Sequence, residues 1–233
     1  MENDCTRIIF IRHGHPDYST DSLTELGHRQ AEAAALRVRE EGIRQVFSST
    51  MGRAVQTARH IAAPLGLEVT QLEFMREIRW GSLGETPIPH NGHPWHTVDD
   101  MVQRDLSLVS PQWETEESFR ENKVVASVQQ KGEDFDLWLR EFGLEREGEH
   151  YRMVSPKNTT VALVSHAGAS DAVLSHLLNL PFPMVCKCLS PNFTAVTVVS
   201  FKGQEGALIS PQVEILNDAR HIRDISEEVF FGN

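Results

Sequence analysis

The chain has 233 residues, of which 40% are hydrophobic and 24% are charged, and its formal net charge is -11. This length suits one large α/β domain with an insertion, and its core can be large enough to need no disulfides. The negative charge argues against a general binder of nucleic acid or of anionic membranes. A few local arginines can still bind a small anionic substrate.

The cysteines and the apolar runs bear on location and cofactors. The chain has only three cysteines, and such a low, odd number is typical of proteins without disulfides in a reducing compartment. Cys186 and Cys188 fit a hydrophobic edge segment better than half of a metal site. The apolar run at 8–11 is too short for a signal peptide or a membrane span. We therefore expect a cytoplasmic protein without a metal or a cofactor.

Strand and helix patterns alternate along most of the chain. Short apolar runs such as 7–11 and 161–164 are typical of strands that are buried on both faces of a parallel sheet. This alternation predicts an α/β fold, a three-layer α/β/α arrangement with a mainly parallel central sheet. Further strands are expected at 44–48, 194–201 and 213–216, and helices at 24–41, 51–63 and 169–178.

The last two expected strands are candidates for the edges of the sheet. Segment 213–216 is expected at an edge. Segment 194–201 is a second candidate edge, through which two copies of the chain could pair as a homodimer. The sequence does not decide the oligomeric state.

Residues 86–158 interrupt the alternation of strands and helices. No strand pattern is clear there, and 115–142 has the pattern of one or two helices with an apolar stripe. Between 114 and 150 the chain carries 11 acidic and 5 basic residues. We expect one domain over 1–233, with a helical insertion or cap over about 86–158.

Two expected strands end in the same way, with a histidine followed by glycine. The first strand leads into Arg12-His13-Gly14, and the second leads into His166-Ala167-Gly168. In open α/β sheets, ligands bind beyond the carboxyl ends of the strands. Glycine lets the backbone turn sharply and approach a ligand closely. Both histidines therefore fall where a binding site is expected.

Two arginines are expected near the same edge. Arg12 directly follows four apolar residues, where a charge is costly unless it meets an anion. Its planar fork matches two phosphate oxygens. Arg53 lies near the start of an expected helix, and helix N-termini also favour anions. These residue types together indicate a binding site for an anion such as a phosphate group.

Five segments with characteristic residues follow one another along the chain, at 12–14, 23–31, 53–58, 75–81 and 165–168. In this order they resemble the histidine phosphatase superfamily, which includes cofactor-dependent phosphoglycerate mutases and histidine acid phosphatases. The resemblance spans most of the chain outside the insertion.

This resemblance implies a role for each matching residue. His13 would attack phosphorus and become phosphohistidine. Glu77 would protonate the leaving oxygen and then activate water. The phosphoryl oxygens would be held by Arg12, Arg53, His166 and Ala167.

The residues after Gly14 depart from the family's pattern. A small polar residue and then an asparagine often follow there, whereas this chain continues with His15-Pro16-Asp17-Tyr18. His15 is therefore either a replacement substrate contact or an exposed loop residue. Trp80 is a second candidate substrate contact. Region 80–155, with Trp95, Trp113 and the local histidines, is expected to shape the leaving-group pocket.

A zinc metallohydrolase is the alternative from another enzyme class. His13, His15 and Asp17 have the spacing H-x-H-x-D, which can bind zinc. Three further histidines are spaced by three residues within 90–96. Asn-Gly and Pro between them indicate a loop rather than a helix that would align them.

Within the family, the alternatives are hydrolysis and transfer. A mutase would carry an extra basic cluster in the insertion to bind a bisphosphorylated cofactor and the substrate carboxylate. This insertion is acidic and has no paired arginines. We therefore predict a phosphomonoester hydrolase that acts on a small phosphorylated metabolite, with a phosphoglycerate mutase-type phosphotransferase as the alternative. A catalytically idle binding domain is disfavoured because every catalytic position is filled.

Overall fold

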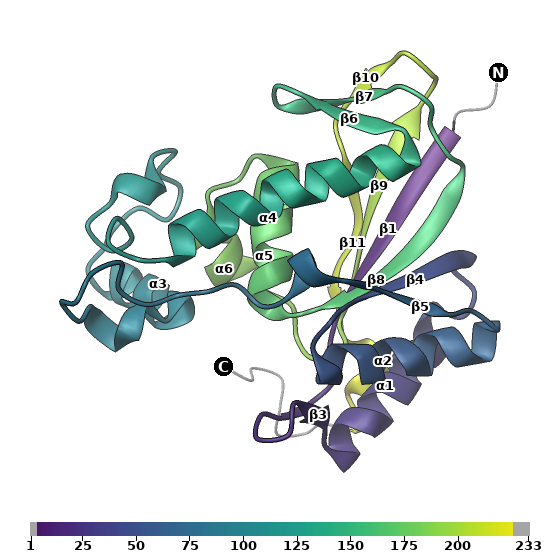
Figure 1. Cartoon of the computed structure of the whole chain (residues 1–233), viewed down its shortest axis with the longest axis horizontal. Coiled ribbons are helices and arrows are strands. Elements are labelled where there is room, and N and C mark those ends of the chain that lie inside the picture. The colour runs from purple at the N-terminus through teal and green to yellow at the C-terminus, as the bar shows by residue number, and fades with distance from the viewer. Residues whose placement is uncertain (1–3, 226–233) are drawn as a thin grey trace.

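The computed structural model describes residues 4–225 and contains a central six-stranded sheet (Figure 1). Its strands are β1 (Asp4–Arg12), β4 (Ile43–Ser49), β5 (Val69–Leu72), β8 (Thr159–Ser165), β9 (Val196–Gly203) and β11 (Gln212–Asp218). They lie in the order β11-β9-β1-β8-β4-β5. The pairs β1–β8, β8–β4 and β4–β5 are parallel, and β9 pairs antiparallel with both β1 and β11.

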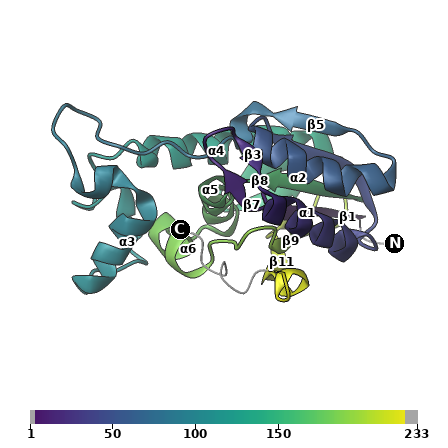
Figure 2. The ribbon, with the colours of Figure 1, turned by 90° about the horizontal axis from the view of Figure 1, so that it is seen from below.

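Helices cover both faces of this sheet (Figures 1 and 2). On β1, Ile8 and Phe10 face one core and Ile9 and Ile11 face the other, because successive side chains of a strand alternate between faces. With both faces covered, the strand is apolar along most of its length. The expected three-layer α/β/α fold is confirmed. The first core contains α4 (Val124–Leu139) and α5 (Ala167–Leu178), and the second contains α1 (Glu25–Val38) and α2 (Gly52–Ala62).

The edges of the sheet differ in part from expectation. β11 lies at an edge, as predicted for 213–216. The prediction of an edge at 194–201 is wrong, because β9 lies between β1 and β11 and is buried from Val196 to Phe201. The homodimer remains a prediction without an assigned strand. The sequence pattern also missed β5, which is short and only partly buried.

The segment between β5 and α4 extends away from the sheet, on the left of Figures 1 and 2. We call residues 80–123 the cap. Its apolar core contains Val98, Trp113 and Phe119, and it packs against Phe182 of the neighbouring helix α6 (Phe182–Cys188). The cap contains α3 (Pro94–Gln103) and the 3-10 helices η3 (Pro89–Gly92) and η4 (Trp113–Thr115).

The rest of 86–158 belongs to the main body. Phe135 and Trp138 of α4 pack into the same core as Ile8 of the central sheet. The expected lack of strands is wrong after α4, because β6 (Leu144–Glu147) and β7 (His150–Met153) form a hairpin. These strands alternate buried and exposed residues over only four positions each, which leaves a weak pattern.

The remaining elements are short. They are β2 (Pro16–Asp17), β3 (Ser22–Leu23), β10 (Leu208–Ile209), η1 (Ala63–Leu65), η2 (Glu73–Met75), η5 (Arg140–Phe142) and η6 (Arg220–Ile222). Among residues 4–225, no helix combines the length and the apolar character that a membrane crossing requires.

The position of α4 in the main core predicts a large effect of a core substitution there. Phe135 is fully buried, so Phe135→Ala should lower the free energy of unfolding by about 3–5 kcal/mol. Leu137 of the same helix is 57% exposed, and Leu137→Ala is the matched control, with an expected loss under about 1 kcal/mol. Urea denaturation measures both. Equal losses would contradict the packing of α4 on the sheet.

Candidate active site

The carboxyl ends of β1 and β8 bring two histidines together. Arg12 of β1 is in register with Ser165 of β8, and the backbone N–H of His13 donates to the carbonyl of Ser165 at 2.9 Å. The rings of His13 and His166 consequently lie 5.1 Å apart between centroids, in an edge-to-face arrangement. The strand-end pattern in the sequence thus located two residues that meet in space.

The hydrogen bonds of His13 define one tautomer of its ring. Nδ1 lies 2.7 Å from the carbonyl oxygen of Gly14, and that oxygen can only accept, so Nδ1 carries the proton. Nε2 lies 3.2 Å from Nε of Arg53, which can only donate. Nε2 therefore presents a lone pair, and the ring is a neutral imidazole.

Burial keeps this imidazole uncharged. His13 is 2% exposed, and desolvation is the main cause that lowers its pKa well below the ordinary value. The guanidinium charges of Arg12 and Arg53 lower the pKa further, against the opposing effect of the Gly14 carbonyl. A neutral imidazole with an unprotonated Nε2 is a competent nucleophile at neutral pH, once a phosphoryl group takes the place of the Arg53 hydrogen bond.

Arg53 is held by the loop between β2 and β3. Its Nη1 forms an ion pair with Asp21, whose other carboxylate oxygen accepts from the backbone N–H of Gly52 at 2.7 Å. A Cβ at position 52 would lie 2.2 Å from the carbonyl oxygen of Asp21, so only glycine fits there. Sequence reasoning missed Asp21, and no local pattern marks it.

Arg12 is buried next to His13. Its Nη1 donates to the carbonyl of Pro191 at 2.9 Å, and its guanidinium carbon lies 4.0 Å from the centroid of the Phe193 ring. Burial lowers the pKa of Arg12, while the nearby Glu77 carboxylate acts in the opposite direction. Both arginines thus converge on His13 from different elements, with the planar forks that suit phosphoryl oxygens.

His166 lies at the N-cap position of α5 and is fully buried. Its Nε2 is 2.8 Å from the hydroxyl of Ser49 at the end of β4. Its Nδ1 has no hydrogen-bond partner among residues 4–225. Desolvation is the main cause that lowers the pKa of His166 well below its ordinary value. Ser49 was not predicted, although its position at a strand end is the signal that found the histidines.

Glu77 lies against the N-terminus of α5. Its Oε1 accepts from the backbone N–H groups of Ile78 and Ala169, both at 2.9 Å. Burial raises the pKa of Glu77, and these bonds and the charge of Arg12 only partly offset it. A Cβ at Gly168 would lie 2.5 Å from the Ile78 side chain and 2.8 Å from Oε1 of Glu77, so glycine permits this close approach.

One cavity of about 1060 Å³ joins these groups to the cap. Five cationic and three acidic side chains line it, which reverses locally the negative charge of the chain. Trp80 and Trp95 line its cap side, as expected for the leaving-group region, whereas Trp113 lies in the core of the cap. The predicted site residues that line it are Arg12, His13, Arg53, Glu77 and Ala167, with His166 packed behind His13.

His15 does not line this cavity. Its Nδ1 is 3.0 Å from the hydroxyl of Thr24, the N-cap residue of α1, and its ring packs edge-on against Phe193. The expected substrate contact at His15 therefore finds no support in this arrangement. His15 instead joins the loop after β1 to the start of α1.

The zinc alternative also lacks support. Nδ1 of His13 binds the Gly14 carbonyl, and Asp17 accepts from Ser19, so these side chains serve different partners. Among residues 4–225, no group of three His, Cys, Asp or Glu side chains could hold a metal ion. This includes the histidines in 90–96. The prediction of a loop there is wrong from residue 94 onward, because α3 begins with Pro94 at its first position.

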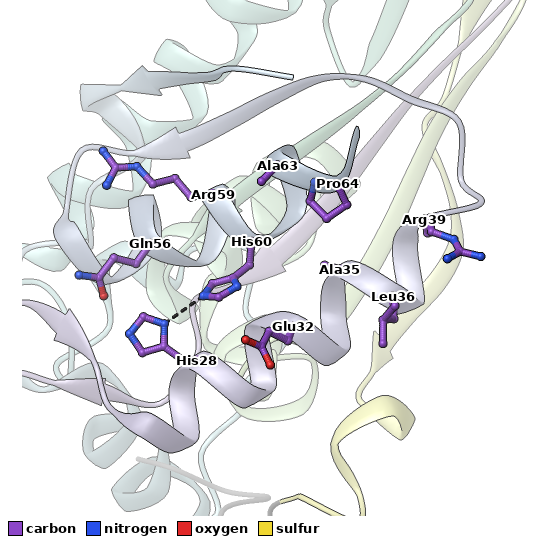
Figure 3. A pocket seen from close by; sticks show the side chains of 10 residues that line it. All are labelled: His28, Glu32, Ala35, Leu36, Arg39, Gln56, Arg59, His60, Ala63 and Pro64. Carbon is purple, nitrogen blue, oxygen red and sulfur yellow. Dashed lines mark hydrogen bonds between the residues drawn. The ribbon is translucent and has the colours of Figure 1, made fainter. Parts of the chain in front are cut away.

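A second hollow lies between α1 and α2, outside the site described above (Figure 3). His28 and His60 face each other across it, with Nδ1 of His28 2.9 Å from Nε2 of His60. None of its lining residues lines the cavity that contains His13, so the two hollows are separate.

A family model described as the histidine phosphatase superfamily (branch 1) matches residues 8–213. The chain therefore belongs to this superfamily. A probable phosphoglycerate mutase GpmB of Yersinia pestis is 37% identical over 91 residues, which are 35% of this chain and 42% of that protein. The match spans less than half of that relative's length.

Solved structures with the same fold include two phosphatases. A phosphoserine phosphatase mutant from Entamoeba histolytica, in complex with phosphoserine, has a TM-score of 0.62 at 19% identity and covers 93% of this chain and 99% of that chain. A mycobacterial glucosyl-3-phosphoglycerate phosphatase has a TM-score of 0.57 at 23% identity, with coverage of 91% and 98%. At these identities, the likeness establishes the fold.

The burial of His166 predicts a pH-dependent stability. The pKa of His166 is lowered on folding, so the unfolded chain binds this proton at a higher pH than the folded protein does. Stability is therefore lost as pH falls through about 6.5, the ordinary histidine pKa. When the pH is lowered from 7.5 to 5, the free energy of unfolding should decrease in both proteins. The decrease should be smaller in His166→Gln than in wild type, by up to about 2 kcal/mol.

Urea denaturation at the two pH values measures this difference. His150→Gln, at an exposed histidine of β7, is the matched control and should follow wild type. A pH dependence of His166→Gln equal to that of wild type would show that His166 is not held neutral by the fold.

Proposed function

We propose that the chain is a phosphomonoester hydrolase that acts through a phosphohistidine at His13 on a small phosphorylated metabolite. The observation that carries this proposal is the orientation of His13 in the cavity. Its Nδ1 is tied to the Gly14 carbonyl, and its Nε2 lone pair lies beside the guanidinium of Arg53. This arrangement places a neutral nucleophile next to a cation that can bind the phosphoryl oxygens.

In the first half-reaction, Nε2 of His13 attacks phosphorus, a P–N bond forms, and the bond from phosphorus to the ester oxygen breaks. Arg12 and Arg53 neutralise the charge on the non-bridging oxygens, and neutral His166 and the backbone N–H of Ala167 donate hydrogen bonds to them. Glu77 gives its proton to the departing oxygen. The raised pKa of Glu77, caused mainly by burial, favours the protonated form that this step needs.

In the second half-reaction, the Glu77 carboxylate takes a proton from a water molecule. As this proton leaves, the water oxygen attacks phosphorus, a P–O bond forms, and the P–N bond breaks. Inorganic phosphate forms, His13 regains its Nε2 lone pair, and Glu77 regains its proton. The hydrogen bond from Nδ1 to Gly14 keeps the ring in one orientation through both steps.

A mutase-type phosphotransferase is the second candidate, favoured by the name of the curated relative and by Arg76 and Arg79, which flank Glu77 and line the cavity. Hydrolysis is favoured by the composition of the cap, which has eight acidic and three basic residues and no paired arginines. With 3-phosphoglycerate, a mutase would yield 2-phosphoglycerate, whereas a hydrolase would release inorganic phosphate.

The role of His13 predicts a trappable intermediate. Rapid acid-free quenching of wild type during turnover of a phosphomonoester should give a phosphoryl group on the protein that is stable in base and labile in acid. His13→Ala should lose this label and lower kcat by at least about a thousandfold. His15→Ala, next to the site but outside the cavity, should still form the label. A His13→Ala protein that retains most of the activity would overturn the mechanism.

The role of Glu77 predicts a dependence on the leaving group. Glu77→Gln should lower kcat/KM for an alkyl phosphate such as glycerol phosphate by about a hundredfold or more, because its alkoxide needs a proton. The loss for 4-nitrophenyl phosphate should be under about tenfold, because nitrophenolate leaves without one. Glu73→Gln, at an exposed carboxylate in the same segment, is the control. Equal losses on both substrates would remove Glu77 from the acid role.

A further inference from the structure

We propose that the cavity binds phosphate esters whose leaving group carries an aromatic ring, and that Trp80, His93 and Trp95 form the wall on which this ring stacks. The inference rests on the proposed phosphatase function and names the substrate class for the same site. We call these three residues the aromatic wall.

The members of the aromatic wall contact one another and face the same cavity as His13. The centroids of Trp80 and His93 lie 5.1 Å apart, with an interplanar angle of 76°, and those of His93 and Trp95 lie 5.3 Å apart. All three line the cavity. Trp80 follows Glu77 by three residues, and His93 and Trp95 lie at the start of α3, so the cap places the wall beside the expected leaving group.

The exposure of the tryptophans separates the wall from the core of the cap. Trp113, in the core of the cap, is 5% exposed and is enclosed by other side chains. Trp80 and Trp95 are only partly buried and retain open ring surface in the cavity. Apolar surface that is open inside a concave site is typical of a binding site for an apolar group.

His93 links the two tryptophans, with its ring edge-to-face against Trp80 and tilted against Trp95. Burial is the main cause that lowers the pKa of His93. Trp95 is held in place by its indole N–H, which donates to the hydroxyl of Ser190 at 3.2 Å. An imidazole between two indoles adds ring surface to the wall, and this surface suits an aromatic group.

The size of the cavity supports a large leaving group. Its volume of about 1060 Å³ lies just above the range of about 300–1000 Å³ that is typical of pockets for drug-sized ligands. A three-carbon leaving group would fill only a small part of this volume. An aromatic ring stacked on the wall would exclude water from the tryptophan faces and would increase binding by about threefold to tenfold.

Two pairs of esters, matched in the chemistry of the leaving oxygen, test this inference. Benzyl phosphate and cyclohexylmethyl phosphate differ in aromaticity, and uridine 5′-monophosphate and ribose 5-phosphate differ in the base. Calorimetry with the His13→Ala protein measures binding without turnover, and phosphate release by wild type measures hydrolysis. We expect the aromatic member of at least one pair to bind about threefold to tenfold more tightly than its partner.

Variants of the wall assign this preference to its residues. Trp80→Leu and Trp95→Leu should reduce the preference to under about twofold, whereas Trp80→Phe and Trp95→Phe should retain it because they keep an aromatic ring. Affinity for the saturated esters should change little in all four variants, which controls for folding. Loss of the preference in the Phe variants to the same extent as in the Leu variants would overturn the stacking role.

The outcomes separate this inference from the proposed function. A preference in both pairs supports any aromatic leaving group, a preference for the uridine ester alone supports a nucleotide, and a preference for the benzyl ester alone supports an aryl compound. Equal binding within both pairs would overturn the inference, even where all four esters are hydrolysed. Tight aromatic binding with no phosphate release from any ester would overturn the proposed hydrolase instead.

Discussion

The hydrogen bond from Nδ1 of His13 to the Gly14 carbonyl is the contact on which the chemistry of the site depends. It leaves the Nε2 lone pair beside Arg53, and it holds the ring in one orientation. Burial then decides the charge state, because desolvation and the nearby guanidinium groups all disfavour an imidazolium. A nucleophile that is neutral, oriented and surrounded by cations is what phosphoryl transfer requires of a histidine.

The fold supplies this arrangement through the geometry of its sheet. Parallel neighbours end at one edge, so the residues that follow β1, β8 and β4 meet there, and the first turns of α2 and α5 add Arg53 and the backbone that binds Glu77. The cap adds the other half of the cavity. The apolar core of the cap also includes Val128 of α4 and Ala172 of α5, which join the cap to the main body.

Strand ends and helix starts made His13, His166 and Arg53 predictable, because strand order in a parallel sheet brings such positions together. The sequence could not reveal Asp21, whose contact with Arg53 depends on how the loop between β2 and β3 folds back onto α2. The sequence also could not show that α4 packs on the central sheet and does not belong to the cap. An apolar stripe marks one face of a helix but does not tell which core that face enters, and here it enters the core of the sheet.

Nitrogen NMR of protein labelled with ¹⁵N-histidine tests the state of His13 most directly, with His13→Gln used to assign its signals. At pH 6.5 without substrate, Nδ1 should give the signal of a protonated, pyrrole-type nitrogen and Nε2 that of an unprotonated, pyridine-type nitrogen. The pattern should persist as the pH is lowered below the ordinary histidine pKa, because burial holds the pKa of His13 well below it. A proton on Nε2, or an imidazolium at pH 6.5, would contradict a neutral nucleophile aimed into the cavity.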